Sequence, residues 1–302
     1  MLSLGVFGTA KNTGKTTVLN AVLRCLWGFG SIAVTSIGFD GEDLDHITGL
    51  PKPKVVVDEG ILVVTSKEVV WRSTAKLVLL SETRIETTFG PLGIYRVKSS
   101  GRVPLVGPNS SDALLEVKDV LKSYDPKFLL VDGAINRMVP FQHVDYIILA
   151  TGASRSRDLK ELLLEAKAIC KALALPKGEA EDRVFLSGPI ELKLLEKYKE
   201  REIVVESPFH LLLVSDYETL FELLNKVKIF VLRRPELLCV TLNPYYPEKR
   251  VEGFRLAMVD LGSLKKLLIE EVHVPCIDVL REEDELFKIL ESKVIGKWAF
   301  MT

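Results

Sequence analysis

The sequence predicts an α/β fold in which helices flank a mostly parallel sheet, followed by a C-terminal α/β region. Three observations indicate this fold. Short apolar runs alternate with amphipathic stretches along the 302 residues, which is typical of βα units. Several runs are apolar throughout, as expected of strands that are covered on both faces. The first run leads through a glycine-containing turn into an amphipathic stretch, which is the order of a strand, a loop and a helix.

The first part of the chain supplies most of the predicted sheet. Strands are predicted at residues 2–7, 31–36, 55–57, 62–65, 77–80, 128–131 and 146–150. Helices are predicted at residues 15–27, 112–122 and 158–175. Asp112 falls in the first turn of its helix, where a carboxylate suits the helix dipole. These elements predict one domain over residues 1–175.

Residues 176–182 interrupt this pattern with a proline, a glycine and several charges, so we expect a domain boundary there. A C-terminal α/β domain of unknown role is predicted over residues 183–302. Its strands are predicted at 184–186, 203–205, 229–232, 238–242, 256–259 and 276–280. Strands between 238 and 280 are also candidates to return to the first sheet.

The composition excludes several classes of protein. With 40 Lys and Arg against 41 Asp and Glu, the chain has no basic excess for nucleic acid. No apolar run approaches the roughly 18 residues of a membrane span, and the N-terminus lacks the basic region of a signal peptide. We therefore expect a cytoplasmic protein without a membrane partner. The four cysteines form no C-x-x-C pair and are expected to be buried, and the four scattered histidines predict no zinc site.

Residues 8–17 carry the strongest functional signal. They read Gly-Thr-Ala-Lys-Asn-Thr-Gly-Lys-Thr-Thr, between a predicted strand and a predicted helix. A loop of this kind wraps a phosphate with backbone N–H groups, while the helix dipole points at the same anion. In such a P-loop, Gly14 permits close approach, Lys15 reaches the β- and γ-phosphates, and the Thr16 hydroxyl binds Mg²⁺. The predicted nucleotide-binding residues are Gly8, Thr9, Asn12, Thr13, Gly14, Lys15, Thr16 and Thr17, with ATP and Mg²⁺ as cofactors.

The spacing of this loop resembles that of one group of P-loop NTPases. Gly8 and Gly14 are separated by five residues rather than four, as in dethiobiotin synthetase and the cobyrinic and cobyric acid synthases. These enzymes belong to the class of the septum-site and partition ATPases. Residues 131–140, VDGAINRMVP, are similar to the family segment Val-Glu-Gly-Ala-Gly-Gly-x-x-Val-Pro, whose acid binds Mg²⁺. The resemblance implies a P-loop NTPase fold, with Asp132 as a metal ligand at a strand end beside Thr16.

Two further segments are similar to parts of the same family. Residues 36–43 lie where the cobyrinate-type enzymes have Lys-x-Gly-Pro-Asp-Tyr-Ile-Asp, which implies a catalytic and metal-binding role for Asp40. Residues 241–247 are similar to the loop beside the adenine, which implies that Asn243 contacts the nucleotide. Asp40 also begins a run of four carboxylates within six residues. That run is either a site for Mg²⁺ or a cationic substrate, or an acidic, solvated turn.

The sequence also departs from the family. Ser36 occupies the position of a lysine that engages substrate and γ-phosphate, and no lysine lies between Lys15 and Lys52. Ile135 and Asn136 replace the paired glycines after the acid. We therefore expect the fold and the nucleotide site to carry over, but not the family's reaction.

These residues predict an ATP-Mg²⁺-binding protein that is an ATPase or an ATP-dependent enzyme acting on a small substrate, with Lys15 and Asp40 as catalytic residues. Two alternatives stay open: a switch or chaperone-like ATPase acting on a protein partner, and a nucleotide-binding module without catalysis. Residues 151–157 contain two arginines at a helix start, and they form either an anion site or a simple turn. The absence of a guanine-reading Asn-Lys-x-Asp segment favours adenine. A homodimer is left open.

Overall fold

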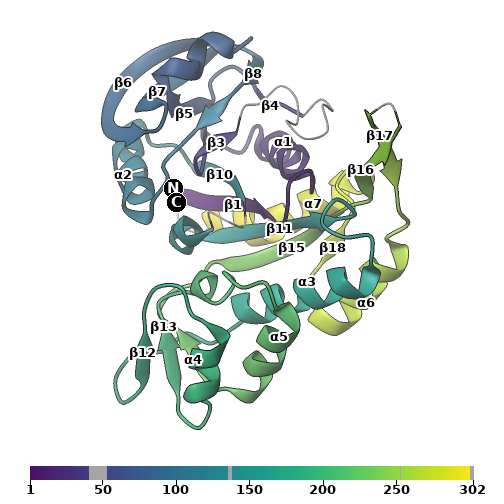
Figure 1. Ribbon diagram of the computed structural model, residues 1–302. Helices are drawn as coiled ribbons and strands as arrows, with labels where there is room; N and C mark the ends of the chain where they lie inside the picture. The colour runs from purple at the N-terminus through teal and green to yellow at the C-terminus, as the bar shows by residue number, and fades with distance from the viewer. Residues whose placement is uncertain (41–52, 135–137, 252, 300–302) are drawn as a thin grey trace.

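The protein, seen here as a computed structural model, is described over residues 1–40, 53–134, 138–251 and 253–299 (Figure 1). Its centre is a nine-stranded sheet in the order β18-β15-β11-β1-β10-β2-β5-β7-β6. Neighbouring strands from β18 to β5 run parallel, whereas β7 is antiparallel to both β5 and β6. The predicted α/β class, with a mostly parallel sheet flanked by helices, is confirmed.

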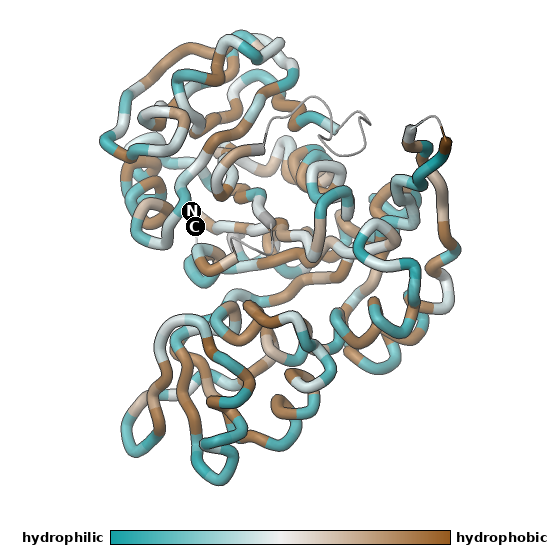
Figure 2. Tube along the Cα trace, viewed as in Figure 1, coloured by the Kyte–Doolittle hydropathy of each residue, from teal (hydrophilic) through white to brown (hydrophobic). Residues whose placement is uncertain are grey.

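The strands of the central sheet overlap the predicted ones. They are β1 (Leu2–Gly8), β2 (Ile32–Ser36), β5 (Leu62–Ser66), β6 (Lys76–Thr87), β7 (Gly90–Ser99), β10 (Phe128–Ala134), β11 (Tyr146–Gly152), β15 (Glu236–Asn243) and β18 (Cys276–Ile277). The prediction at 77–80 covers only the first part of β6, because the second part, residues 81–87, is mostly polar and lacks an apolar run. Figure 2 shows the apolar residues concentrated along the central strands.

Helices cover both faces of the sheet. On one face, α1 and α7 pack against Leu4 and Val6 of β1. On the other, α2, α3 and α6 pack in one core with Phe7 of the same strand. The helices are α1 (Lys15–Leu26), α2 (Ser111–Leu121), α3 (Leu159–Leu173), α6 (Gly262–Val272), α7 (Glu283–Leu290) and α8 (Gly296–Ala299). No helix in the described ranges is long and apolar enough to cross a membrane.

A small separate sheet is inserted between α3 and β15. It consists of β12 (Val184–Leu186), β13 (Ile203–Val205) and β14 (Ile229–Val231), all parallel, together with α4 (Leu192–Lys197) and α5 (Tyr217–Lys226). After this insertion the chain returns to the central sheet through β15 and β18. Strands on both sides of the predicted boundary at 175–183 therefore share the sheet that contains β1.

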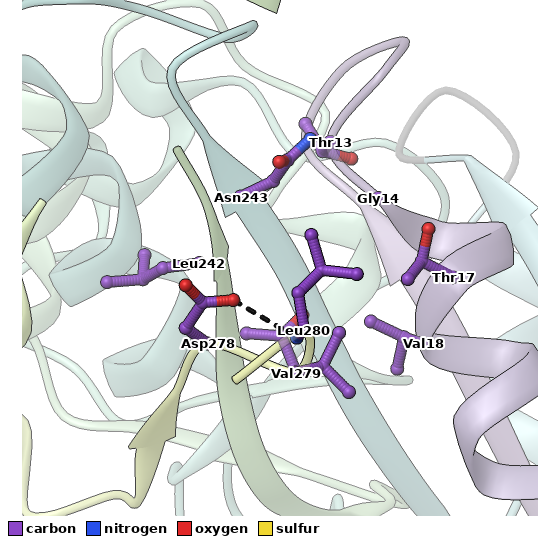
Figure 3. A pocket seen from close by; sticks show the side chains of 10 residues that line it. Thr13, Gly14, Thr17, Val18, Leu242, Asn243, Asp278, Val279 and Leu280 are labelled. Atoms are coloured by element: carbon purple, nitrogen blue, oxygen red, sulfur yellow. Dashed lines mark hydrogen bonds between the residues drawn. The ribbon is translucent and has the colours of Figure 1, made fainter. Parts of the chain in front are cut away.

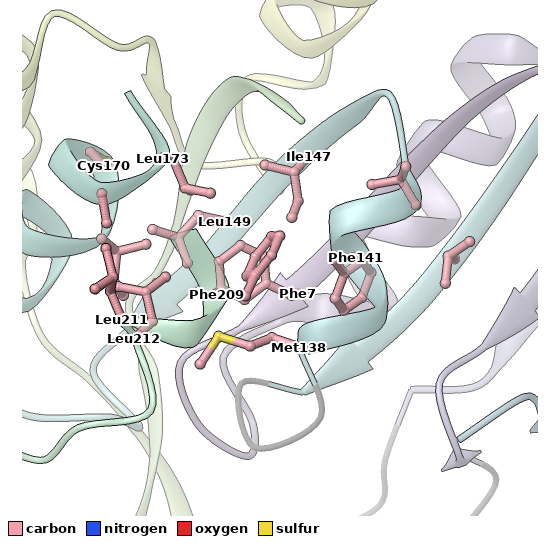
Figure 4. Close-up of a cluster of buried hydrophobic side chains, with 14 of the residues drawn as sticks. Phe7, Met138, Phe141, Ile147, Leu149, Cys170, Leu173, Phe209, Leu211 and Leu212 are labelled. Carbon is pink, nitrogen blue, oxygen red and sulfur yellow. The ribbon is translucent and has the colours of Figure 1, made fainter. Parts of the chain in front are cut away.

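Aromatic side chains join the insertion to the central sheet. Phe209, from the short helix Pro208–His210, packs edge-on against Phe7, with 6.1 Å between ring centroids (Figure 4). Phe141 lies 6.0 Å from Phe7 and 6.4 Å from Phe209. All three rings are fully buried, so the insertion and β1 share one apolar core.

Three pairs of short strands lie outside these sheets. They are β3 (Phe39–Asp40) with β9 (Leu105–Val106), β4 (Val55–Val57) with β8 (Gly101–Val103), and β16 (Tyr245–Arg250) with β17 (Gly253–Met258). All three pairs are antiparallel. The predicted strand at 256–259 overlaps the last three residues of β17, and the β16–β17 hairpin projects from the rest of the molecule at the right of Figure 1.

The four cysteines are buried, as predicted, and none of them forms a disulfide. Burial raises the pKa of the Cys25 thiol to about 11, and those of Cys170 and Cys276 to about 12. These thiols stay protonated at neutral pH, so they act as small apolar side chains.

Candidate functional site

The candidate site lies at the carboxyl edge of the parallel strands. Asp132 of β10 is level with Ser36 of β2, while Gly152 of β11 is level with Asn243 of β15. Gly8, the last residue of β1, lies between these strands. From β1 the chain passes to β2 on one side, and the later strands β11 and β15 lie on the other. In open α/β sheets, ligands bind in the crevice formed where the strand order reverses in this way.

The loop after β1 folds back on its own start. A Cβ at Gly8 would lie 2.4 Å from Thr13 Oγ1 and 2.7 Å from Lys15 Cγ. The Thr13 hydroxyl donates to the Ala10 carbonyl at 3.1 Å, within the same loop. Only glycine fits at position 8, because the loop closes directly over it.

The helix that follows begins without a side-chain cap. Gly14, its N-cap, has φ of 88°, and the first turn of α1 contains no acidic residue. By contrast, Ser110 caps α2 and Asp158 caps α3. The first N–H groups of α1 thus have no capping side chain as acceptor, so they suit an anion. Lys15 Nζ donates to the Ala10 carbonyl at 3.3 Å, which is long for such a bond.

Two contacts hold the loop to the strands on one side. Asn243 donates to the Asn12 carbonyl at 2.8 Å, and its side-chain oxygen accepts from the Tyr245 N–H at 3.1 Å. The hydroxyls of Thr9 and Thr151 are 2.9 Å apart and buried. The backbone of Asn12 is left-handed, with φ of 62°, and the bond from Asn243 to its carbonyl holds it in this conformation. Asn243 therefore links the loop after β1 to the β16–β17 hairpin.

Asp132 lies at the end of β10, with 1% of its surface exposed. Side chains alternate along a strand, and Phe128 and Leu130 belong to the core on the α1 face. Asp132 therefore projects to the face that carries α1 and Thr16. The role of Asp132 as a metal ligand beside Thr16 stays a prediction.

A pocket of about 300 Å³ opens between the loop and the β16–β17 hairpin. The loop and the first turn of α1 contribute Lys11, Asn12, Gly14, Lys15, Thr16 and Thr17. Asn243 and the hairpin residues Tyr245, Tyr246, Pro247 and Leu256 form the other side, with Leu280 from the segment after β18. The predicted residues Gly8, Thr9 and Thr13 do not line this pocket, and the side chains of Thr9 and Thr13 are buried.

A small cavity of about 20 Å³ adjoins this pocket, at the seam between the start of α1 and the ends of β15 and β18. Figure 3 shows Asn243 and Thr13 at the loop, with Asp278 and Leu280 on the other side of the seam. The Leu280 N–H donates to the Asp278 carboxylate at 3.1 Å, which fixes the turn after β18. Leu280 lines both cavities, so this turn forms part of the wall of the larger pocket.

Only part of the predicted acidic segment is described. The backbone of Asp40 pairs with Leu105 of β9, but its side chain lies outside the described part of the structure. Residues 41–52 also lie outside it, as do Ile135 and Asn136 in the loop after Asp132. The predicted catalytic and metal-binding roles of Asp40 stay predictions.

The two arginines of the loop 151–157 have different partners, and neither lines the pocket. Arg155 donates to Glu165 at 2.8 Å and to Glu161 at 3.3 Å, so its charge is paired within the protein. Burial raises the pKa of Glu165, and the bond from Arg155 opposes that rise. Arg157 instead lies over the ring of Tyr246, 5.4 Å from its centroid.

The sequence prediction placed residues 241–247 in a loop beside the adenine and 256–259 in a strand, but it missed that these segments pair as a hairpin that forms one wall of the pocket. The signal was present, since two strand-like runs, 245–250 and 253–258, are separated by only two residues and the second begins with glycine. The aromatic pair after Asn243 was interpreted as part of a loop. Strand β16 is half-exposed, so it lacks the apolar run that marks the buried strands.

No group of three or more histidine, cysteine or acidic residues that could bind a metal occurs in the ranges that the structure describes. No family model, curated protein or solved structure matches the chain.

Proposed function

We propose that this protein binds a nucleoside triphosphate, ATP in the first instance, with Mg²⁺, and hydrolyses it or uses it to modify a small substrate. The P-loop NTPase fold is part of this proposal. One observation carries it: the loop after β1 closes over Gly8 and presents Lys15 and the uncapped start of α1 to a pocket. A closed loop, a helix N-terminus and an ammonium group in one place suit a phosphate chain.

Lys15 is available for a phosphate. Its bond to the Ala10 carbonyl is long and joins a charge to a neutral acceptor. Among the described residues, Lys15 makes no ion pair with a carboxylate. Exchange of this bond for one to an anionic phosphate oxygen adds the attraction between opposite charges.

Thr16 and Asp132 supply the oxygen ligands that Mg²⁺ prefers. Thr16 lines the pocket, and Asp132 projects to the same face of the sheet from the adjacent strand. When bound there, Mg²⁺ would neutralise charge on the β- and γ-phosphates. The protein's part is then to position the phosphates and to stabilise their charge through Lys15 and the N–H groups of the loop.

Titration calorimetry with Lys15→Ala tests the proposal. We expect the affinity for ATP-Mg²⁺ to fall about 10- to 150-fold, the value of a charge-assisted hydrogen bond. Lys122→Ala is the matched control, because Lys122 is an exposed lysine at the end of α2, paired only with Asp119 among described residues. Unchanged affinity in a folded Lys15→Ala protein would refute the proposal. Phosphate release from ATP, followed in parallel, separates hydrolysis from binding alone.

A further inference from the structure

One edge of the central sheet is long, apolar in part and open. Strand β6 is the last strand of the sheet, and among the described residues it pairs only with β7. Its 12 residues make it about twice as long as a typical strand, whereas natural proteins commonly keep edge strands short. In Figure 1, β6 curves along the outer left of the molecule. This edge offers room for a further strand.

Backbone groups at the start of β6 point away from the sheet. Leu77 is opposite Val97 of β7. The Val97 N–H donates to the Ile61 carbonyl at 3.0 Å, and the Val97 carbonyl accepts from the Gly60 N–H at 2.9 Å. Both groups of Val97 are therefore used on the side away from β6, so the N–H and C=O of Leu77 face the outer edge. The same holds for Leu79, two residues along the strand.

The side chains along this edge are apolar and exposed. Residues 77–80 read Leu-Val-Leu-Leu, and Val78 and Leu79 are 40% and 42% exposed. Their side chains point to opposite faces of the sheet, so both faces of the strand carry apolar surface. β6 and β7 pair without a shift in register from Leu77 to Leu79, with shifts on either side. In the described ranges, no backbone segment besides β7 is bonded to this regular run.

An open edge of this kind suits another β-strand, because a strand matches its alternating N–H and C=O groups. The edge is complementary to itself in charge. Lys76 precedes the apolar run and Glu82 follows it, so antiparallel self-pairing brings the lysine of each copy towards the glutamate of the other. The ion pair of Glu82 with Lys67 leaves the two side chains 60% and 62% exposed, so it binds Glu82 only weakly.

The opposite edge of the same sheet limits the assembly to two chains. That edge is β18, which has only two residues, Cys276–Ile277, both buried. It presents too little open strand to continue the pairing. Two β6 edges that meet across a two-fold axis use each other completely, so the contact closes on itself.

We propose that β6 pairs with β6 of a second copy of this chain, antiparallel and about a two-fold axis at Val78. Leu77 of each copy is then opposite Leu79 of the other, and their outward N–H and C=O groups exchange hydrogen bonds. Val78 meets its own counterpart at the axis. Lys76 lies diagonal to Glu82 of the second copy, within reach of a long side chain. The two central sheets become one continuous sheet, and the small contact makes a weak dimer.

Analytical ultracentrifugation over a range of protein concentrations tests this pairing. We expect the mean mass of the wild type to rise from one chain towards two between about 10 µM and about 1 mM, the range of a weak interface. Circular dichroism of each variant checks that it is folded. The measurement needs no nucleotide, so it is independent of the proposed function.

Substitutions at the axis make the test specific. Val78→Lys places two like charges side by side, so it should weaken the dimer about tenfold, and Val78→Glu should do the same. An equimolar mixture of these two variants should restore the dimer, because the axis then joins opposite charges. Leu79→Pro removes an outward N–H but no bond to β7, so it should also weaken the dimer. Val56→Lys is the matched control, since Val56 is a strand valine that is 46% exposed on β4, which pairs with β8.

Each contrary result overturns the inference. A wild type that keeps the mass of one chain at about 1 mM would show that the edge stays unpaired. A dimer of unchanged strength in folded Val78→Lys and Val78→Glu would be held by another surface. If each variant is monomeric and their mixture is monomeric too, the axis does not lie at Val78. A mass that rises beyond two chains would contradict the closed pair.

Discussion

Replacement of Gly8 by alanine should disable the phosphate loop and preserve the fold. The added Cβ would lie 2.4 Å from Thr13 Oγ1, and ordinary contact begins at 3.4 Å, so part of the loop must move by about 1 Å. Overpacking of this size costs about 1–3 kcal/mol of unfolding free energy. A loop displaced by about 1 Å loses at least one charge-assisted hydrogen bond to phosphate, which is worth about 1.5–3 kcal/mol, or about 10- to 150-fold in affinity. We therefore expect Gly8→Ala to fold with a lower melting temperature and to bind ATP-Mg²⁺ about 10- to 150-fold more weakly.

The assay is calorimetric titration of the folded variant, with Gly296→Ala as the control. Gly296 begins α8, and a Cβ there meets only the Glu291 carbonyl, at 3.2 Å, so it should leave affinity unchanged. Wild-type affinity in folded Gly8→Ala would mean that the closed loop does not hold phosphate. A loss of stability without a loss of affinity would assign Gly8 to packing alone.

Three further predictions follow from the site and its surroundings. Asp132→Asn should weaken ATP binding at least about tenfold with Mg²⁺ present but leave binding in EDTA unchanged; an equal loss in both titrations would make Asp132 structural. Asn243→Ala removes bonds of 2.8 and 3.1 Å, so urea denaturation should show a loss of about 1–3 kcal/mol; an unchanged midpoint would contradict the link between loop and hairpin. Burial lowers the pKa values of His143 and His210 in the folded protein below the ordinary histidine value of 6.5. As the pH falls through about 6.5, these histidines take up protons in the unfolded chain before they do so in the folded one, so the free energy of unfolding should fall between about pH 7.5 and 5.5. His143→Gln should reduce this fall in urea titrations; a fall of the same size would assign it to other groups.

The parallel centre of the fold could be predicted because its strands are buried on both faces. The runs at 128–131 and 146–150 are apolar throughout, and each forms the greater part of a central strand. The second part of β6 and the whole of β16 carry polar residues on an open face, so they lack this signal. An unbroken apolar run therefore decides which strands can be predicted from the sequence, and such runs are commonest where a strand is buried on both faces.

The same distinction holds at the candidate site. The strand, loop and helix around Gly14 are contiguous, so local sequence was sufficient to predict them. The contact between Asn243 and Asn12 joins residues 231 positions apart, and it depends on the return of β15 to the central sheet. The prediction assigned Asn243 to the nucleotide, but its side chain also connects two walls of the pocket. The pairing of Arg155 with buried Glu165 depends likewise on how α3 packs.

The surroundings of Ser36 bear on which reaction the proposed site can support. Ser36 is level with Asp132 at the carboxyl edge, and its buried hydroxyl donates to the Gly38 carbonyl at 2.6 Å. A Cβ at Gly107 would lie 1.7 Å from the Ser36 carbonyl, so a second backbone segment packs directly on this position. A lysine at this position could supply a fixed charge to substrate and γ-phosphate, whereas this hydroxyl is short and already bonded. Positive charge at the proposed site then comes from the loop after β1, through Lys15, and acts on the phosphates. Such a site favours hydrolysis or phosphoryl transfer governed by positioning over activation of a substrate carboxylate held from β2.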